Sequence, residues 1–397
     1  MCCTGTCSLT AVPKISDLIH KNGWYIRVVF VTNNCQNTMW YKTKLTDKLG
    51  IQYPIIQGPF GGGPSSVKLL STVSNAGGLG SFGAYGLTPQ QIIDLDKELK
   101  ASTDKPYAIN LWVSENDERL KSYSSAAYET LLQKFKPYFD ELGVPLPQMP
   151  TQLGKNFEEQ FEALLKAKPP VFSFVYGIPS KEILADCKKA GIKTAGAATT
   201  VDEAVALEEA GVDAIVATGF EAGGHRVSFL RAAEDSLTGI FALIPQVADK
   251  VKIPFVAAGG IADGRGIAAA LTLGASGVQI GTAFLACEES NATTVHREAL
   301  FSSEAKYTTL TKAFSGRLAR GIRSRLSEDM KPFENEMAPF PMQSIFLRSL
   351  REAAITQNKS GFVTFWSGQA APIIKHKKAG ELFSSLVEET SEIFNHR

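Results

Sequence analysis

The sequence predicts an α/β protein whose main body is a (β/α)8 TIM barrel. Eight short apolar segments between residues 53 and 284 alternate with segments of helical spacing. Strands this uniformly apolar must be covered on both faces, which requires a parallel sheet flanked by helices. Eight such units in about 235 residues is the size of one barrel of this class.

The predicted units follow one another along the chain. We expect strands at residues 53–59, 78–85, 107–113, 171–177, 193–199, 213–219, 253–260 and 277–284. We expect helices between them at 66–78, 88–101, 156–168, 180–190, 201–210, 237–249 and 264–273. Thr88 is a typical helix-capping residue, and Pro89 suits the first helical position. The short connections do not fit two Rossmann domains, and no GxGxxG follows the first strand.

The chain divides into three predicted regions: an N-terminal extension (1–40), the barrel (41–285) and a mainly helical cap packed on it (286–397). The extension has one acidic residue, Asp17, and no periodicity. It is interpreted as a targeting segment, a disordered tail or an over-extended start before Met39. A proline-containing insertion after the third strand, residues 114–154, is interpreted as a lid or substrate wall. Helices are expected in the cap at 343–357 and 378–394.

Composition excludes several classes of protein. The 397 residues are 44% apolar and 20% charged, which is typical of a globular protein. A formal net charge of +1 argues against binding nucleic acid or a membrane surface through bulk charge. No segment has the roughly 18 apolar residues of a membrane span. Cys187 and Cys287 are expected to be buried free thiols, which is typical of a reducing compartment such as the cytoplasm.

Metal and nucleophile chemistry find little support in the sequence. Cys2, Cys3 and Cys7 have no matching Cys/His pair at zinc-finger spacing. The chain contains no HExxH, no GxSxG and no P-loop. We therefore expect no metal site.

The segment IVATGFEAGGH, residues 215–225, carries the strongest site signal. It begins as a buried strand and ends at His225, after a glycine-rich turn. Barrels place their chemistry at the carboxyl ends of the strands, so His225 is the candidate catalytic residue. The alternative is an incidental surface histidine on an ordinary turn. Arg226 beside it is interpreted either as steering an anion or as a solvated loop residue.

The last two expected strands end in turns suited to a phosphate. One ends at Gly259 and Gly260 before the helix 264–273, and the other at Gln279, Ile280, Gly281 and Thr282. Glycines let backbone N–H groups approach an anion, and a helix N-terminus adds about half a positive charge. The alternative is that both are ordinary tight turns.

Residues 44–369 resemble the nitronate monooxygenase family, formerly called 2-nitropropane dioxygenases. The matching segments are YPIIQGPFGG (53–62), INLWV (109–113), GFEAGGHR (219–226), AAGGIADGRGI (257–267), QIGTAF (279–284), SGRLARGI (315–322) and WSGQAA (366–371). Taken singly, EAGGH and AAGGIADGR also fit the related flavin-dependent enoyl-acyl carrier protein reductases.

The resemblance implies an FMN-dependent enzyme with His225 as the catalytic base. It would oxidise alkyl nitronates, and also nitroalkanes, with dioxygen. The products would be a carbonyl compound and nitrite. The implied cofactor-binding residues are Gln57, Gly58, Pro59, Asn110, Gly223, Gly260, Gln279, Ile280, Gly281 and Thr282. An imidazole poised near neutral pH would remove the α-proton of a nitroalkane.

The chain departs from the family pattern at two places. Thr218 stands where members often have glutamine, so one flavin contact is absent or rebuilt. Val227 and Ser228 follow Arg226 where many members have glycine, which leaves the path of that loop open. An NAD(P)H-dependent flavin reductase acting on an enoyl thioester or a quinone is the alternative enzyme. A barrel that keeps FMN as a structural or sensing ligand is the non-enzymatic alternative.

Overall fold

The computed structural model describes residues 39–113, 117–151, 153 and 156–396. Residues from Met39 onward form one compact unit. Within the described chain, eight parallel strands make the central sheet: β1 (Ile55–Gln57), β2 (Gly80–Gly83), β3 (Tyr107–Trp112), β4 (Val171–Val175), β5 (Lys193–Ala198), β6 (Ala214–Thr218), β8 (Phe255–Ala258) and β9 (Gly277–Ile280).

The sheet closes on itself. Each strand pairs with the next in the order β1-β9-β8-β6-β5-β4-β3-β2, and a parallel bridge between Ile56 and Leu79 joins the two ends. Four of these strands, β1, β3, β6 and β8, are buried along their full length, and the other four have one or two half-buried residues each, as the two-sided cover of a barrel requires. The predicted (β/α)8 barrel is confirmed.

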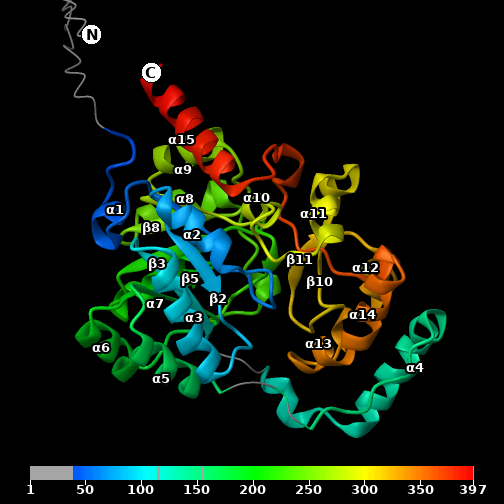
Figure 1. Cartoon of the computed structure of the whole chain (residues 1–397). Coiled ribbons are helices and arrows are strands. Elements are labelled where there is room, and N and C mark those ends of the chain that lie inside the picture. The colour runs from blue at the N-terminus through cyan, green and yellow to red at the C-terminus, as the bar shows by residue number, and fades with distance from the viewer. Residues whose placement is uncertain (1–38, 114–116, 152, 154–155, 397) are drawn as a thin grey trace, which may run out of the picture. The chain divides into compact units, whose positions relative to one another are not determined.

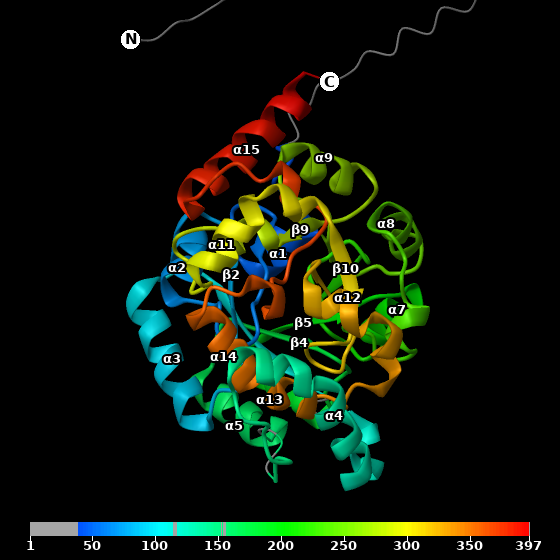
Figure 2. The same ribbon diagram turned by 90° about the vertical axis from the view of Figure 1, so that its right-hand side faces the viewer.

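Helices surround the barrel, as Figure 2 shows around β4 and β5. They are α2 (Val67–Asn75), α3 (Pro89–Ser102), α5 (Phe157–Ala167), α6 (Lys181–Ala190), α7 (Val201–Glu209), α8 (Ile240–Ala248) and α9 (Gly264–Thr272), with the short α10 (Thr282–Leu285) after β9 and α1 (Lys44–Leu49) before β1. Thr88 caps α3 as predicted: its side chain accepts from the Gln91 N–H, and Pro89 is at the first helical position. Each predicted helix is therefore present, within a few residues of its expected bounds.

The insertion after β3 contains structure that the sequence reading missed. Its described residues form a 3-10 helix, Glu118–Ser122, and the long helix α4 (Ser125–Leu142). Pro137 lies inside α4, although proline usually kinks or ends a helix. α4 packs against the C-terminal region (Figure 1). Its Tyr138 hydroxyl donates to the Asp329 carboxylate at 3.1 Å. A lid or substrate wall remains the interpretation of this insertion.

The C-terminal region is mainly helical but also contributes strands. Its helices are α11 (Thr294–Phe301), α12 (Arg325–Met330), α13 (Met342–Phe346), α14 (Arg348–Thr356) and α15 (Ala379–Asn395), and α15 packs against α9 (Figure 1). The strands β10 (Thr308–Thr311) and β11 (Ala319–Ile322) were not predicted. They form an antiparallel sheet with β7 (Gly224–His225), so this region reaches the end of the IVATGFEAGGH segment. A domain boundary at residue 285 remains a prediction.

The described chain begins next to its own C-terminal helix. Trp40 Nε1 donates to the Ser391 hydroxyl of α15 at 2.9 Å. The predicted extension lies, up to residue 38, outside the described residues. Across the described part of the chain, every helix is too short or too polar to cross a membrane.

Candidate active site

His225 lies beyond the carboxyl end of β6, as the sequence predicts. After β6 ends at Thr218, the chain turns and forms β7, in which His225 pairs with Ala319 of β11. The residues just before β11, Ser315 to Arg317, are thereby brought beside the histidine. The C-terminal region therefore forms one wall of the site.

The His225 ring is held by one polar partner and three aromatic rings. Its Nε2 atom lies 2.9 Å from the Ser315 hydroxyl oxygen. Ring centroids of Trp112, Trp366 and Phe340 lie 5.4, 5.3 and 6.1 Å from that of the imidazole. These rings arrive from β3, from the segment after α14 and from the segment before α13, so the site is assembled from parts distant in sequence.

His225 is a neutral imidazole in this environment. Burial and, to a smaller extent, the positive charge of Arg317 together lower its pKa to about 3. The expectation of an imidazole poised near neutral pH is therefore wrong, because an apolar pocket with a nearby cation disfavours the charged ring. His225 keeps a free proton-accepting nitrogen at every physiological pH.

Arg317 brings a positive charge into this aromatic surrounding. Its guanidinium carbon lies 4.1 Å from the Tyr176 ring centroid and 4.5 Å from that of Phe340. Tyr176 follows β4 and has a positive φ of 63°, which is uncommon for a residue with a side chain. The half-buried Arg317 and the neutral His225 thus both lie against the Phe340 ring.

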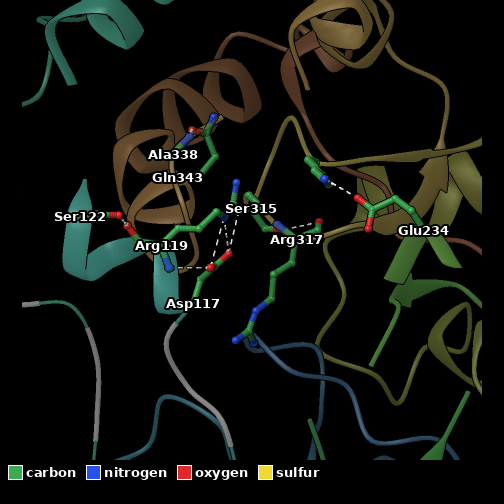
Figure 3. A network of polar contacts seen from close by, with 10 residues as sticks. Asp117, Arg119, Ser122, Glu234, Ser315, Arg317, Ala338 and Gln343 are labelled. Atoms are coloured by element: carbon green, nitrogen blue, oxygen red, sulfur yellow. Dashed lines mark hydrogen bonds and ion pairs between the residues drawn. The ribbon is translucent and has the colours of Figure 1, made fainter. Parts of the chain in front are cut away.

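The insertion after β3 contacts the turn that carries Ser315 and Arg317 (Figure 3). Arg119 pairs with Asp117 at 2.7 Å and donates to the Gly316 carbonyl oxygen at 3.1 Å. On the other side, Lys312 forms an ion pair with Glu234 from the loop after β7 (Figure 3). The insertion after β3 and the loop after β7 therefore both hold this turn in position.

Arg226 neither steers an anion nor lies in solvent, so both interpretations of it are wrong. It is 2% exposed, and its guanidinium donates to the carbonyl oxygens of Gly219 at 2.7 Å, Thr218 at 3.1 Å and Ser236 at 2.9 Å. Burial lowers its pKa to about 10, which leaves it charged at neutral pH. Arg226 therefore stabilises the loop that contains His225.

Of the residues expected beside a flavin ring, Gln57 ends β1, Gly58 and Pro59 follow it, and Asn110 lies within β3. Gln57 is fully buried, with its side-chain oxygen accepting from the Ser81 N–H at 2.9 Å. Asn110 donates to the Ser173 hydroxyl at 3.0 Å. Gly58 lies against the next strand end, since a Cβ there would be 3.3 Å from the Gly281 Cα. Pro59 follows Gly58 at this edge.

The residues expected around a phosphate converge on one backbone segment. The Gly368 N–H donates to the Thr282 hydroxyl at 2.9 Å, and a Cβ on Gly223 would be 2.5 Å from that same nitrogen. A Cβ on Gly260 would be 3.6 Å from Glu221, which is two residues from Gly223. The turns after β6, β8 and β9 therefore meet here.

The backbone near Gly281 fits an anionic group. Within the described part of the chain, the N–H groups of Gly260 and Gly281 make no hydrogen bond. A Cβ on Gly281 would meet only the Phe60 ring, at 3.9 Å, and no side chain caps α10. Gln279 is half-buried, whereas Ile280 is buried and its carbonyl accepts from the Gly58 N–H at 2.9 Å. Only the backbone of Ile280 would face a ligand.

The N-terminus of α9, in contrast, does not supply the positive end expected of it. The Gly264 N–H donates to the Glu389 carboxylate at 2.8 Å, and the Arg265 and Gly266 N–H groups donate to Asp263 at 3.1 and 3.2 Å. Two carboxylates thus occupy this helix end. The expectation that it adds to a phosphate site is wrong, because α15 brings Glu389 to it.

Sequence reasoning named no role for Ser315, Arg317, Trp112 or Phe340. The first three belong to the segments SGRLARGI and INLWV, which carried the family resemblance without a stated function. Phe340 lies in no motif. The hydrogen bond of Ser315, the ring contacts of Trp112 and Phe340 and the charge of Arg317 show that these residues surround His225.

Fold and site define an enzyme of the (β/α)8-barrel class with its candidate site at the carboxyl ends of the strands. The family model for nitronate monooxygenase matches residues 42–389. A "Probable nitronate monooxygenase" of Staphylococcus aureus strain Newman is 39% identical over 360 residues, covering 90% of this chain and all of the relative. The relative of the same name in strain MSSA476 is 40% identical over the same length. The chain belongs to the nitronate monooxygenase family, whose members are oxidoreductases.

Solved structures of similar proteins support the same family and fold. Nitroalkane oxidase from Streptomyces ansochromogenes is 33% identical, with a TM-score of 0.81, covering 89% of this chain and 99% of that one. FabK from Thermotoga maritima is 28% identical, with a TM-score of 0.69, covering 89% and 98%. Both likenesses extend over almost the whole described chain.

Proposed function

We propose that this protein oxidises alkyl nitronates, and nitroalkanes too, with FMN and dioxygen, giving a carbonyl compound and nitrite. The observation that carries the proposal is the set of side chains around His225. It combines a neutral imidazole, the cation of Arg317 and the rings of Trp112 and Phe340 beyond the carboxyl end of β6. Such surroundings attract a small anion and lower the water content around it.

FMN is the proposed cofactor, bound along the carboxyl ends of the strands. Gln57, Gly58, Pro59 and Asn110 would lie near its ring. Its phosphate would lie near the backbone of Gly223, Gly260, Gln279, Ile280, Gly281 and Thr282. The open N–H groups of Gly260 and Gly281 support this assignment. When bound, FMN supplies the redox chemistry, taking electrons from the substrate and passing them to dioxygen.

Thr218 does not take over the flavin contact of the glutamine that is common at this position in the family. Its side chain is nearly buried, and its carbonyl oxygen is bound by Arg226. We therefore propose that this chain does without that flavin contact.

His225 is the proposed base for a neutral nitroalkane. Because the pKa of the protonated His225 ring is about 3, the neutral ring is a weaker base than a free imidazole. A nitronate is already deprotonated and needs no base. The site therefore favours nitronates over neutral nitroalkanes, with Arg317 attracting the anion.

Two measurements test the proposal. The absorbance spectrum of the purified protein should show a flavin, released as FMN on denaturation. Aerobic incubation with an alkyl nitronate should then consume dioxygen and form nitrite. Colourless protein, or yellow protein without nitrite formation, would refute the proposal.

A second candidate is an NAD(P)H-dependent flavin reductase of the enoyl-acyl carrier protein reductase or quinone reductase type. The likeness to FabK favours it, whereas the enoyl reductase domain of MlnA from Bacillus amyloliquefaciens, 12% identical, shares the fold alone. Anaerobic NADPH separates the two functions, because a reductase bleaches the flavin rapidly and a nitronate monooxygenase does not.

We also propose a cytoplasmic location. Cys187 and Cys287 are buried free thiols, and burial raises the pKa of Cys187 to about 12. Unreactive, unpaired cysteines are typical of proteins from a reducing compartment.

A further inference from the structure

Ser315 lies between His225 and a carbonyl group. Its hydroxyl oxygen is 2.9 Å from His225 Nε2 and donates to the Arg317 carbonyl oxygen at 3.1 Å. Ser315 is 3% exposed, which leaves little room for water to substitute for either partner. A hydroxyl has one proton, so it can donate to only one of these two neighbours at a time.

The chemistry of the two neighbours decides the direction of the bonds. A carbonyl oxygen can only accept, so the Ser315 proton points to Arg317 and the Ser315 oxygen accepts from His225 Nε2–H. In the opposite arrangement the Arg317 carbonyl would lose this donor, and the proton of His225 would be on Nδ1. Among the described residues, the hydrogen-bond partner of the ring is at Nε2 and Nδ1 has none, so the protein's own groups favour the proton on Nε2.

We propose that Ser315 is a positioning residue that holds His225 as the Nε2–H tautomer, so that Nδ1 is the atom that accepts the substrate proton. The inference rests on the proposed function for its catalytic meaning, but the tautomer itself does not. Neutral His225 carries one proton, and Ser315 fixes it on Nε2, which leaves the Nδ1 lone pair available.

The proton transfer balances at this site. The α C–H bond of a nitroalkane breaks, a new N–H bond forms at Nδ1, and the electron pair remains on the substrate, which becomes a nitronate. His225 becomes an imidazolium that still donates from Nε2 to Ser315. The added proton leaves to solvent from Nδ1, which restores the starting tautomer.

The tautomer can be read directly by NMR of the full-length, flavin-loaded protein labelled with ¹⁵N-histidine. Protonated and unprotonated ring nitrogens have well-separated chemical shifts, and the chain has only 5 histidines. His225→Asn identifies the signals. His296 is an internal standard: its Nε2 lies 3.0 Å from the Trp366 carbonyl oxygen, which can only accept, so its tautomer is Nε2–H.

We expect His225 to show a protonated Nε2 and an unprotonated Nδ1, as His296 does. Ser315→Thr keeps a hydroxyl and should keep this pattern, whereas Ser315→Ala should give averaged shifts from two tautomers. Ser290→Ala is the matched control: it removes another buried serine hydroxyl, bound to the Leu285 carbonyl at 2.7 Å, and should leave the His225 signals unchanged.

Turnover provides the second readout. Ser315→Ala should lower kcat for a neutral nitroalkane by about 10- to 100-fold. This loss is smaller than the roughly 10²–10⁴-fold loss expected when a general base is removed. Ser315→Thr keeps the hydroxyl and should have a kcat close to that of the unaltered protein. Turnover of a preformed nitronate should change by less than about threefold.

The two readouts separate two kinds of failure. A protonated Nδ1 in the unaltered protein overturns the inference even if nitronates are oxidised. An unaltered tautomer and unaltered turnover in Ser315→Ala overturn the role of Ser315. Absence of nitronate oxidation refutes the proposed function, while the NMR result still decides the tautomer.

Discussion

The lowered pKa of His225 predicts an unusual pH dependence. We consider a change from about pH 8 to about pH 5 in an assay with a neutral nitroalkane, whose turnover needs a base. In such assays the acid limb of kcat/KM reports the pKa of the base in the free enzyme. Because burial and the Arg317 charge keep the imidazole neutral, we expect no acid limb in this range.

The size of the effect follows from the two pKa values. With its ordinary pKa of 6.5, His225 would be about 3% neutral at pH 5, and kcat/KM would fall about 30-fold. With a pKa of about 3, the ring is about 99% neutral at pH 5 and kcat/KM stays level. Protonating His225 in the fold thus costs about 5 kcal/mol more than protonating a free imidazole, at about 1.4 kcal/mol per tenfold change.

Initial rates of dioxygen consumption, measured at several nitroalkane concentrations, give kcat/KM at each pH. Circular dichroism at each pH checks that the fold persists. Arg317→Gln is the informative variant: removing the smaller of the two causes should raise the pKa of His225 while burial still holds it below 6.5. Should neutral nitroalkanes prove inert, the ¹⁵N signals of His225 report the same titration. An acid limb near pH 6.5 in the unaltered protein would refute the reasoning.

Three further predictions concern the cofactor, the loop and the N-terminus. Gly281→Asp should be purified without flavin, because it places a negative charge beside the proposed phosphate, whereas Gly281→Ala should keep it; absorbance spectra measure both. Arg226→Met should lower the free energy of unfolding by about 2–5 kcal/mol, measured by chemical denaturation, because three carbonyl oxygens lose a charged donor. A chain that begins at Met39 should be recovered in solution and yellow, since the contact of Trp40 with Ser391 remains.

Each of these predictions has a contrary outcome. Near-stoichiometric FMN in Gly281→Asp would remove that residue from the phosphate site. Arg231→Met changes an exposed arginine and should cost less than about 0.5 kcal/mol; an equal loss in Arg226→Met would contradict its structural role. Insoluble or colourless protein from Met39 onward would show that the preceding residues contribute to folding or cofactor binding.

The barrel could be predicted because its signals are local. The segment DAIVATG becomes β6 because a short apolar run bounded by glycine suits a buried strand. Thr88 and Pro89 start α3 through contacts within one turn. The β10–β11 pair was missed, since its strands carry charged or polar residues and depend on β7 as a third partner.

The candidate site was predicted in part for the same reason. His225 was singled out because glycines precede it after a predicted strand, a pattern visible in the sequence. Its pKa was misjudged, since the cause lies in distant residues that bury it and in Arg317. The buried position of Arg226 was not predicted, because no local pattern shows that the chain turns back and brings the Ser236 carbonyl oxygen to its guanidinium.

The sequence by itself determined the order of strands and helices, the barrel that they close and the position of His225 at its carboxyl end. These follow from periodicity and turn residues, which act over a few positions of the chain. Only the tertiary structure decided what surrounds the histidine. Ser315, Arg317 and Trp112 come from segments separated by up to about 200 residues, and α15 places Glu389 on the α9 N-terminus. Polar partners and charges of this kind are set by packing between elements, which no local pattern encodes.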